Sequence, residues 1–393
     1  MPFYNDLRPS KDFDERDFVR VRPDMQADEK LRCIDGLLRL KRQLEASVSA
    51  RRTEDTLLVA SWNIVSLGSG DYRTGEALYY LAEILSRFDL IAVQEVKPSL
   101  ADLDRLIRIL GPNWAYMVND ATGGDEGNDE RSAYIYNTNR VRPSGIAGEL
   151  SIWNALAQSS PLGLRDLKRP AYMTGFVTGW KQFALINLHL HPGKDAEKRT
   201  ANGIIPADSA LRQEEMRLLL SVLADRMDKL WTQNLVLVGD MNFYRTHDDA
   251  TIDLIHAAGF WESAGLVGKT TNITTDPADA ETYDRMFFNG DDYFRIATVD
   301  GQEQGGVLNP FLSVYRDEDW PAYRSVMRDK HGTPAKGAAL MTDDAAAIRY
   351  FKQTFRKRQL SDHFLIWVEL AVDDSAAFLA GKRPDVAADI PAG

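Results

Sequence analysis

The sequence predicts an α/β (α+β) fold in which sheets are covered by helices. Short apolar runs of strand length are mixed with amphipathic helical segments along the chain. Several strand-like runs follow one another with hairpin-like spacing, which argues against a purely doubly wound parallel sheet. With 393 residues, of which 44% are hydrophobic, the chain can bury a sizeable core in one large domain with appendages or in two domains.

The composition narrows the class of protein. No apolar run approaches the roughly 18 residues of a membrane-spanning helix, and the start lacks a basic-then-apolar signal pattern, so we expect no membrane partner and a cytoplasmic location. The single cysteine, Cys33, rules out an internal disulfide. A net charge of −11 argues against a protein that coats nucleic acid with a basic surface. This negative charge is compatible with a nuclease that holds a divalent cation with carboxylates.

Residues 1–55 are predicted to form an N-terminal arm and an amphipathic helix. The first 26 residues are polar and contain three prolines, so we expect an extended or partly ordered arm. From Ala27 to about Ala50, apolar residues recur at helical spacing: Leu31, Ile34, Leu37, Leu38 and Leu44. This stripe must be covered, and we favour packing on the body of the protein over self-association through the helix.

The remaining elements follow in order. Strands are expected at 57–64, 89–96, 114–118, 133–136, 140–147, 171–179, 181–190, 235–242, 282–288 and 364–370. Helices are expected at 74–88, from Ser99, at 206–230 and at 248–258. Residues 300–358 are less regular, with two helical stretches, and are interpreted as an insertion or lid. Residues 373–393 are interpreted as a loose tail.

Polar side chains stand at the ends of the apolar strands. The run from Leu235 to Val238 stops at Gly239 and then presents Asp240 and Asn242, which share one face if the strand continues. By itself this pattern also fits a turn closed by an Asx side chain. The other strand ends carry Asn63, Glu95, His189, Asp284, and Asp362 with His363. If the strands end on a common rim, these groups meet.

This set of residues indicates metal-assisted phosphate chemistry. Oxygen ligands without thiolates suit Mg²⁺, Mn²⁺ or Ca²⁺ and suit zinc poorly. A cation held by carboxylates beside two histidines can hydrolyse a phosphate ester, because the cation neutralises charge while the side chains supply a base and an acid.

Six motifs resemble the endonuclease/exonuclease/phosphatase family, and within it the deoxyribonuclease I-like nucleases. They occur in the family's order: WNI at 62–64, QEV at 94–96, NLHL at 187–190, GDMN at 239–242, YDR at 283–285 and SDH at 361–363. The strands that carry them span residues 57–370, about four-fifths of the chain. The resemblance implies a four-layer α-β-β-α sandwich with two packed mixed, mostly antiparallel sheets, and a catalytic domain over 56–372.

The resemblance also implies roles for individual residues. Glu95 is the principal metal ligand, helped by Asn63, with Asp362 nearby. Asp240 orients the attacking water and Asn242 the phosphate. His363 pairs with Asp284 and His189 with Glu130, which gives an acid–base couple. The metal is Mg²⁺, with Mn²⁺ as a substitute and Ca²⁺ as a further option.

The basic residues near the motifs are expected to contact substrate phosphate. The Glu130–Arg131 pair is typical of the deoxyribonuclease I branch, Lys97 stands where that branch has an arginine, and Arg169 falls at a DNA-contacting arginine. The disulfides of the secreted deoxyribonuclease I-like nucleases are absent, and an acidic loop at 125–130 would repel DNA unless it points away or binds calcium. A basic run just before SDH is open to two interpretations, a solvated helix face or a grip on phosphate: Lys352, Arg356, Lys357 and Arg358.

Three functions compete on the sequence alone. The leading hypothesis is a metal-dependent nuclease that cuts DNA. The alternative is a phosphatase or phosphodiesterase acting on inositol phosphates or sphingolipids. The third is a catalytically silent binding module, which would need a broken motif, and none of the six is broken. His191 is interpreted as a loop contact, and His247, His256 and His331 have no supporting neighbours.

Overall fold

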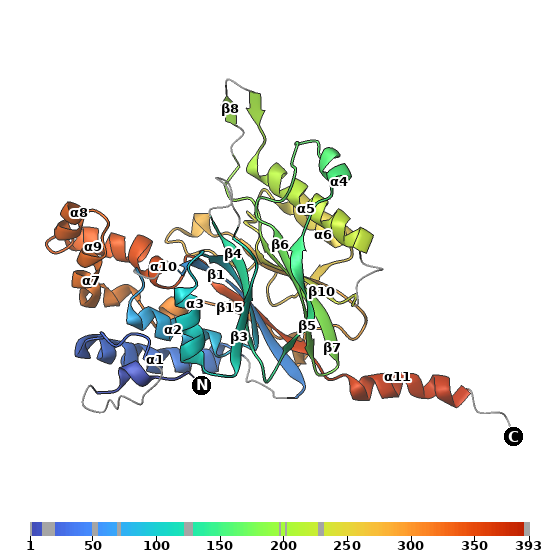
Figure 1. The fold of residues 1–393 in the computed structure, drawn as a ribbon, viewed down its shortest axis with the longest axis horizontal. Coiled ribbons are helices and arrows are strands. Elements are labelled where there is room, and N and C mark those ends of the chain that lie inside the picture. Colours follow the sequence, from blue (N-terminus) through green and yellow to red (C-terminus); the bar gives the residue numbers. More distant parts are fainter. Residues whose placement is uncertain are drawn as a thin grey trace.

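Two six-stranded sheets lie face to face, with helices on the outer side of each (Figure 1). The computed structural model describes residues 2–9, 20–48, 54–68, 72–121, 129–195, 198–200, 203–226 and 232–388. The two facing sheets and their outer helices confirm the predicted α/β class and the α-β-β-α layering.

The first sheet has the order β15-β16-β1-β2-β4-β3. Its strands are β15 (Gly305–Leu308), β16 (Leu365–Ala371), β1 (Thr56–Leu67), β2 (Leu90–Val96), β4 (Arg131–Asn137) and β3 (Trp114–Val118). β1 and β2 pair in parallel, and the other neighbours pair antiparallel. The sheet is thus mixed and mostly antiparallel, as predicted.

The second sheet has the order β11-β12-β10-β7-β6-β5. Its strands are β11 (Trp261–Glu262), β12 (Asp284–Asn289), β10 (Leu235–Asp240), β7 (Lys181–His189), β6 (Ala171–Thr178) and β5 (Arg142–Leu150). Here β10 and β7 form the parallel pair. Two small hairpins stand apart from the sheets: β8 (Lys198–Thr200) with β9 (Gly203–Ile205), and β13 (Thr298–Val299) with β14 (Gln302–Glu303).

Helices form the outer layers. On the side of the first sheet lie α1 (Ala27–Ser47), α2 (Gly75–Leu85), α3 (Ala101–Leu110), α7 (Arg324–Asp329), α8 (Pro334–Ala339), α9 (Asp344–Tyr350), a π-turn (Phe351–Phe355) and α10 (Arg356–Gln359). On the side of the second lie α4 (Asn154–Gln158), α5 (Asp208–Arg226) and α6 (Asp249–Ala257). Short 3-10 turns occur at Asn5–Leu7, Pro277–Asp279, Pro310–Leu312 and Asp317–Tyr323. Among the described residues, no helix is long and apolar enough to cross a membrane.

The central strands are buried on both faces. In β1, Leu57 and Val59 pack between the two sheets, whereas Leu58 and Trp62 pack under the helices. A strand that is covered on both sides needs apolar residues at every position. This explains why β1 and β10 appear in the sequence as continuous apolar runs without alternation.

Helix α1 packs on the body of the protein, as favoured from the sequence. Its buried side chains join the core that it shares with α2: Cys33, Leu37, Leu40 and Leu44. Two members of the expected stripe do not join it, since Leu31 is 61% exposed and Leu38 is 54% exposed. Self-association through this helix stays a prediction.

The segment 300–358 is largely built into the fold. β15 forms an edge of the first sheet, and Phe311, Tyr315, Phe351 and Phe355 join the core under α1 and α2. Arg39 Nε of α1 donates to the carbonyl of Ser313 at 2.9 Å. Most of the expected insertion or lid is therefore part of the helical layer.

The expected loose tail contains a helix, α11 (Ser375–Ala388), which extends away from the sheets (Figure 1). None of its residues is buried. Its base is fixed because Asp374 lies 2.5 Å from Lys181 Nζ and also pairs with Arg295. Alanine is the best helix former, and the alanines of this segment explain why it is helical in spite of its Pro and Asp content.

Candidate active site

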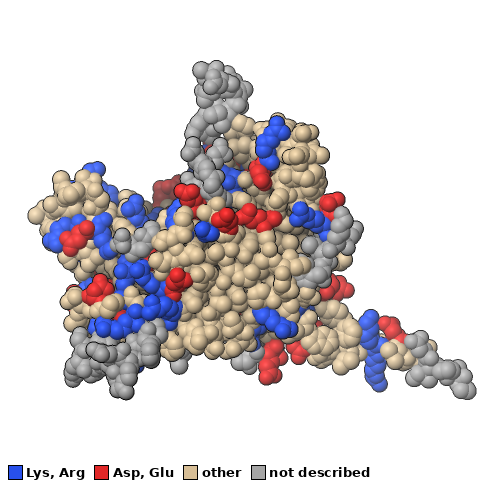
Figure 2. All heavy atoms as spheres, in the orientation of Figure 1, with Lys and Arg blue, Asp and Glu red and all other residues tan. Residues whose placement is uncertain are grey.

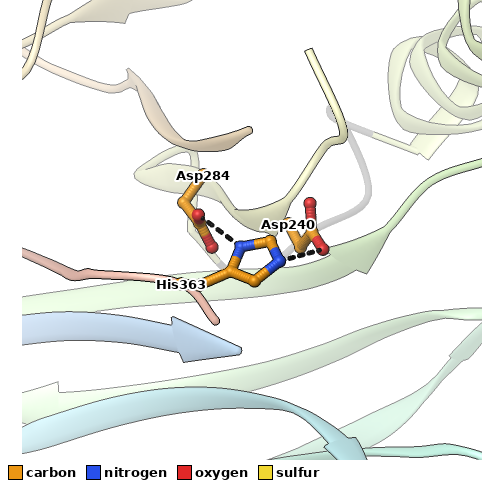
Figure 3. A group of neighbouring side chains, drawn as sticks. All are labelled: Asp240, Asp284 and His363. Atoms are coloured by element: carbon orange, nitrogen blue, oxygen red, sulfur yellow. Dashed lines mark hydrogen bonds and ion pairs between the residues drawn. The ribbon is translucent and has the colours of Figure 1, made fainter. Parts of the chain in front are cut away.

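The polar ends of strands from both sheets meet around Asp240. Its Oδ2 lies 2.9 Å from Asn63 Nδ2 on β1. The same oxygen is 3.5 Å from His189 Nε2 and 3.7 Å from His363 Nε2. Figure 3 shows the carboxylates of Asp240 and Asp284 on either side of the His363 ring. Side chains from both sheets thus face one buried carboxylate.

The register of β10 with its two neighbours decides what lies beside Asp240. In the parallel pair Asp240 is opposite His189, and in the antiparallel pair it is opposite Asp284. Gly239 makes the first pairing possible, because a Cβ added there would lie 2.1 Å from the carbonyl oxygen of Leu188. Gly239 also has φ +139, which side chains rarely adopt. The glycine before Asp240 therefore lets two strands approach closely at the site.

His363 is held between Asp284 and Asp240. Its Nδ1 lies 2.8 Å from Asp284 Oδ2, and both side chains are buried. Burial by itself would lower the pKa of His363, but the charges of Asp284 and Asp240 raise this pKa well above its ordinary value. The imidazole therefore carries its proton at neutral pH.

The two carboxylates beside His363 are in different electrostatic environments. Burial opposes the charged form of Asp240, but the charges of His363 and His189 and a hydrogen bond from Asn63 hold its pKa below the ordinary value. Burial raises the pKa of Asp284, and the negative charge of Asp240 adds to this effect. Asp240 is thus the anion at the centre of the site.

His189 has its own carboxylate partner. Glu130, just before β4, places Oε2 3.3 Å from His189 Nδ1 and 2.7 Å from Arg169 Nε. Its other oxygen lies 3.3 Å from Lys97 Nζ. Burial opposes ionisation of Glu130, but the nearby His189, then the charges of Arg169 and Lys97, lower its pKa to about 2. Glu130 is therefore charged at any physiological pH.

An irregularity in the pairing of β2 with β4 sets the direction of the Glu95 side chain. The pairing of β2 with β4 shifts register between Val93 and Val96, and Glu95 has φ 59. Along a regular strand, side chains point alternately to the two faces of the sheet, and a β-bulge of this kind changes the direction of a side chain. Glu95 Oε1 accepts a hydrogen bond from Asn63 Nδ2 at 3.1 Å, and Oε2 accepts one from the backbone N–H of Ser66 at 3.2 Å. Asn63 thus bridges Glu95 and Asp240.

Asp362 is not joined by a hydrogen bond to the other two expected metal ligands in the described part of the chain. Its Oδ1 is a buried atom that has no hydrogen-bond partner among the described residues. A different group has metal-binding geometry, since one ligand atom each of Asp240, Asp284 and His363 lies within 4.8 Å of the others. In that group Asp284 Oδ2 already contacts the imidazole.

Asn242 forms an Asx turn, which is one of the two interpretations offered for the GDMN motif. Its backbone N–H donates to Asp240 Oδ1 at 2.9 Å, which is an Asx turn, and its φ is 52. Its side chain donates to the carbonyl of Leu190 at 3.1 Å. β10 ends at Asp240, so Asn242 lies in the turn after the strand and does not continue it.

The basic residues expected at phosphate are engaged within the protein. Arg169 is buried against Glu130, with a side chain only 7% exposed, whereas Lys97 is 24% exposed. Arg131 turns to the neighbouring loop and donates to the carbonyl of Asn119 at 2.9 Å. Most of the acidic loop at 125–130 lies outside the described residues.

The other histidines lie away from this cluster. His191 Nε2 is 3.2 Å from Asp208 Oδ1, in agreement with its interpretation as a loop contact. The partners of the remaining three are Asp195 for His247, the carbonyl of Phe260 for His256, and the backbone N–H of Thr333 for His331. None of these contacts involves the groups around Asp240.

Known proteins of one family are similar to this chain in sequence. The model of the Endonuclease/Exonuclease/phosphatase family matches residues 60–363. The chain belongs to this family. It is 26% identical to human deoxyribonuclease-1 over 273 residues, which cover 66% of this chain and 84% of that protein. Rat deoxyribonuclease-1 is 24% identical over 195 residues, which cover 48% of this chain and 60% of that protein.

Solved structures with a similar fold cover most of the chain at low identity. A conserved protein of unknown function from Enterococcus faecalis V583 has a TM-score of 0.47 at 16% identity, covering 81% of this chain and 100% of its own. A family member from Bacteroides thetaiotaomicron has a TM-score of 0.46 at 18% identity, covering 81% of this chain and 98% of its own. Membership of the family supports a hydrolase that acts on phosphodiester bonds.

Two motif residues of this family member have contacts that sequence reasoning did not assign. Gln94 of QEV donates to Asn187 Oδ1 of NLHL at 2.6 Å. Asn187 Nδ2 in turn donates to the carbonyls of Val93 and Ala133, both at 3.1 Å. This buried amide pair links the two sheets beneath the site. The signal in the sequence is a polar residue inside an otherwise apolar strand, which must be hydrogen-bonded to be tolerated.

A buried ion pair fixes the loops that leave β7 and β10. Arg212 on α5 makes two hydrogen bonds of 2.9 Å to Asp248, and both side chains are fully buried. Arg212 also donates to the carbonyl of Gly193 at 2.8 Å, and Asp248 accepts from the backbone N–H of Tyr244 at 2.8 Å. The sequence offered no indication of this pair, because its partners are distant in the chain and belong to no motif.

Proposed function

We propose that the protein is a divalent-metal-dependent phosphodiesterase, a DNase I-like endonuclease that cuts DNA. The observation that carries this proposal is the position of Asp240 between two imidazoles, each of which has a carboxylate on its far side. Family membership and the similarity to deoxyribonuclease-1 support the choice of DNA. We also keep a cytoplasmic location as a prediction.

Asp240 and the histidines supply the proton chemistry of the proposed reaction. Asp240 is anionic, so it accepts a hydrogen bond from the attacking water and orients it toward phosphorus. As water adds and the bond from phosphorus to the leaving oxygen breaks, one proton leaves the water and one proton is given to the leaving oxygen. His189 and His363 are the acid–base couple for these transfers.

The carboxylates behind the imidazoles hold them in place. Asp284 and Glu130 each contact a ring Nδ1, so the Nε2 atoms of both rings face the centre of the site. A carboxylate on one ring nitrogen fixes the tautomer and supports positive charge on the ring. His363, which carries a proton, also offers positive charge to the phosphate oxygens.

The oxygen-rich end of the site fits a hard divalent cation. Glu95 offers a carboxylate, and Asn63 Oδ1 and Asp362 Oδ1 are buried atoms without a hydrogen-bond partner in the described part of the chain. This donor set suits Mg²⁺, with Mn²⁺ as a substitute and Ca²⁺ as a third option. Such a cation, bound by Glu95 and Asn63 with Asp362 nearby, would neutralise charge on the phosphate.

The proposal is tested by incubating the protein with supercoiled plasmid in Mg²⁺, Mn²⁺, Ca²⁺ or EDTA. We expect nicking with Mg²⁺, none with EDTA, and a loss of roughly 10²–10⁴-fold in Asp240→Asn and His363→Ala. His256→Ala is the matched control, because His256 is an exposed residue of α6.

Two results would contradict the proposal. Nicking that survives in Asp240→Asn and His363→Ala would remove the assignment of the site. Release of phosphate from inositol phosphates, without nicking of plasmid, would replace DNA by the alternative substrate class.

A further inference from the structure

A pocket with a basic lining opens beside the candidate active site. It has a volume of about 330 Å³ and is lined by Val65, Ser66, Tyr72, Arg73, Lys97 and Arg358. Three of these six residues are cationic and none is acidic. In a chain of net charge −11, such a lining is a local exception that favours an anionic ligand. We call it the basic pocket.

The walls of the basic pocket are fixed to each other. Gln359 Nε2 donates to the carbonyl of Tyr72 at 3.1 Å, and Gln359 Oε1 accepts from the backbone N–H of Thr74 at 2.8 Å. These bonds join α10 to the loop that follows β1. Arg73 donates to the carbonyl of Ser66 at 3.1 Å, which closes the same loop. The pocket is therefore formed before any ligand binds.

The basic pocket shares residues with the candidate active site. Ser66 donates its backbone N–H to Glu95 Oε2 at 3.2 Å. Lys97 Nζ lies 3.3 Å from Glu130, the partner of His189. One group bound in the pocket and another at Asp240 would thus be neighbours.

Arg358 is the lining cation most suited to a ligand. Arg73 is engaged by backbone carbonyls and lies 3.6 Å from Asp102, and Lys97 faces Glu130. Among the described residues, Arg358 has no carboxylate within ion-pair distance, and it is exposed. Its guanidinium lies over the Tyr72 ring, 5.2 Å from the centroid. A guanidinium is planar, and its N–H groups can hold a phosphate with two hydrogen bonds.

We propose that the basic pocket binds a phosphate that neighbours the one to be cleaved, with Arg358 as its principal contact. The substrate class is then a chain with successive phosphodiesters. This inference rests on the proposed function and deepens it, because the segment 300–358 supplies a substrate contact through Arg358. On the face drawn in Figure 2, Lys and Arg side chains also gather over α2, α3 and the nearby α7–α10, which suits a polyanion extending past the pocket.

The test compares Arg358→Gln with Arg383→Gln on two substrates. Arg383 is an exposed residue of α11, and α11 follows the end of β16 that is opposite to the end next to His363. The two variants thus lose the same charge at opposite ends of the sheet. The substrates are duplex DNA and bis(4-nitrophenyl) phosphate, a diester with no neighbouring phosphate.

We expect Arg358→Gln to raise the KM for DNA by roughly tenfold, the effect of one charge-assisted hydrogen-bonding contact. The slope of log KM against log salt should fall by about 0.9, the value for one lost phosphate contact. Hydrolysis of bis(4-nitrophenyl) phosphate should be unchanged, and Arg383→Gln should match wild type on both substrates. Arg358→Lys should recover part of the loss.

A second measurement locates the contact on the substrate. Binding of labelled DNA in EDTA is followed by fluorescence anisotropy, with one phosphate at a time replaced by a neutral methylphosphonate. Wild type should lose affinity at a position next to the cleaved linkage, and Arg358→Gln should show no further loss at that position.

The outcomes separate the two proposals. If wild type hydrolyses neither substrate, the proposed function fails. If wild type cleaves DNA but Arg358→Gln behaves as Arg383→Gln, only the basic-pocket proposal fails. Equal losses on both substrates in Arg358→Gln would also overturn it, because the residue would then act on the site in general and not on a neighbouring phosphate.

Discussion

Glu130→Gln is the substitution with the most direct consequences for both stability and catalysis. The carboxylate lies against His189, Arg169 and Lys97, and its side chain is 7% exposed. Its pKa falls from 4.5 to about 2, which corresponds to ~3 kcal/mol of interactions that favour the charged form. Glutamine keeps the shape and removes the charge, so the variant should lose up to about this amount of unfolding free energy at pH 7.

The pH dependence follows from the direction of this pKa shift. The folded pKa is lower than the unfolded pKa, so the stabilisation is present above pH 4.5 and is lost as the pH falls from 4.5 toward 2. Urea denaturation in EDTA at pH 7, 4.5 and 3 measures it. The difference in unfolding free energy between wild type and Glu130→Gln should be largest at pH 7 and small at pH 3. Glu45→Gln on the exposed side of α1 should change stability by no more than about 0.5 kcal/mol.

Two results would refute this reasoning. If the difference in unfolding free energy between wild type and Glu130→Gln were the same at every pH, the charge of Glu130 would not be what stabilises the fold. Full DNA nicking by Glu130→Gln would mean that His189 does not need its carboxylate, whereas we expect the rate to fall roughly 10²-fold or more.

Three further predictions concern Glu76 in α2, the Arg212–Asp248 pair and Gly239. Burial raises the pKa of Glu76 to about 7, so the folded state binds more protons than the unfolded state between pH 4.5 and 7 and loses stability as the pH rises through this range. In thermal unfolding, the stability of Glu76→Gln relative to wild type should therefore be higher at pH 8 than at pH 5. A higher relative stability at pH 5 would contradict the raised pKa of Glu76. Arg212→Met should lose about 3–5 kcal/mol in urea denaturation because it leaves Asp248 buried and unpaired, and adding Asp248→Leu should restore much of this loss. Gly239→Ala should lower plasmid nicking far more than Gly332→Ala, since a Cβ meets the Leu188 carbonyl at 2.1 Å in the first case and nothing within 4 Å in the second; equal activities would argue against the close approach.

Much of the fold could be predicted from the chain in order. β1 and β10 appear as apolar runs because both of their faces are covered, and α1 appears as an amphipathic stripe because one of its faces is covered. These patterns depend only on residues that are close in sequence. The helix α11 was not predicted, since its Pro and Asp content outweighed its alanines in the sequence interpretation, although the alanines govern the local conformation.

The members of the candidate site could be predicted from the sequence, and the family resemblance also predicted two of its contacts, His363 with Asp284 and His189 with Glu130. The remaining contacts could not be predicted. His189, Asp240, Asp284 and His363 meet, with Glu130 and Glu95 beside them. Lys97 and Arg169 were expected to bind phosphate, yet both lie against Glu130. A cation pairs with the nearest carboxylate, and that carboxylate comes from another strand. Spacing along the chain carries no information about such a partner.

By itself, the sequence determined which strands are buried and which polar residues stand at their ends. Only the tertiary structure decided which way the side chains at those strand ends point and which groups they meet. The shift of register at Glu95, the close approach at Gly239 and the pairing of Asp240 with His189 depend on which strands become neighbours. Burial patterns are local along the chain, whereas strand register and ion pairing join residues that are far apart in it.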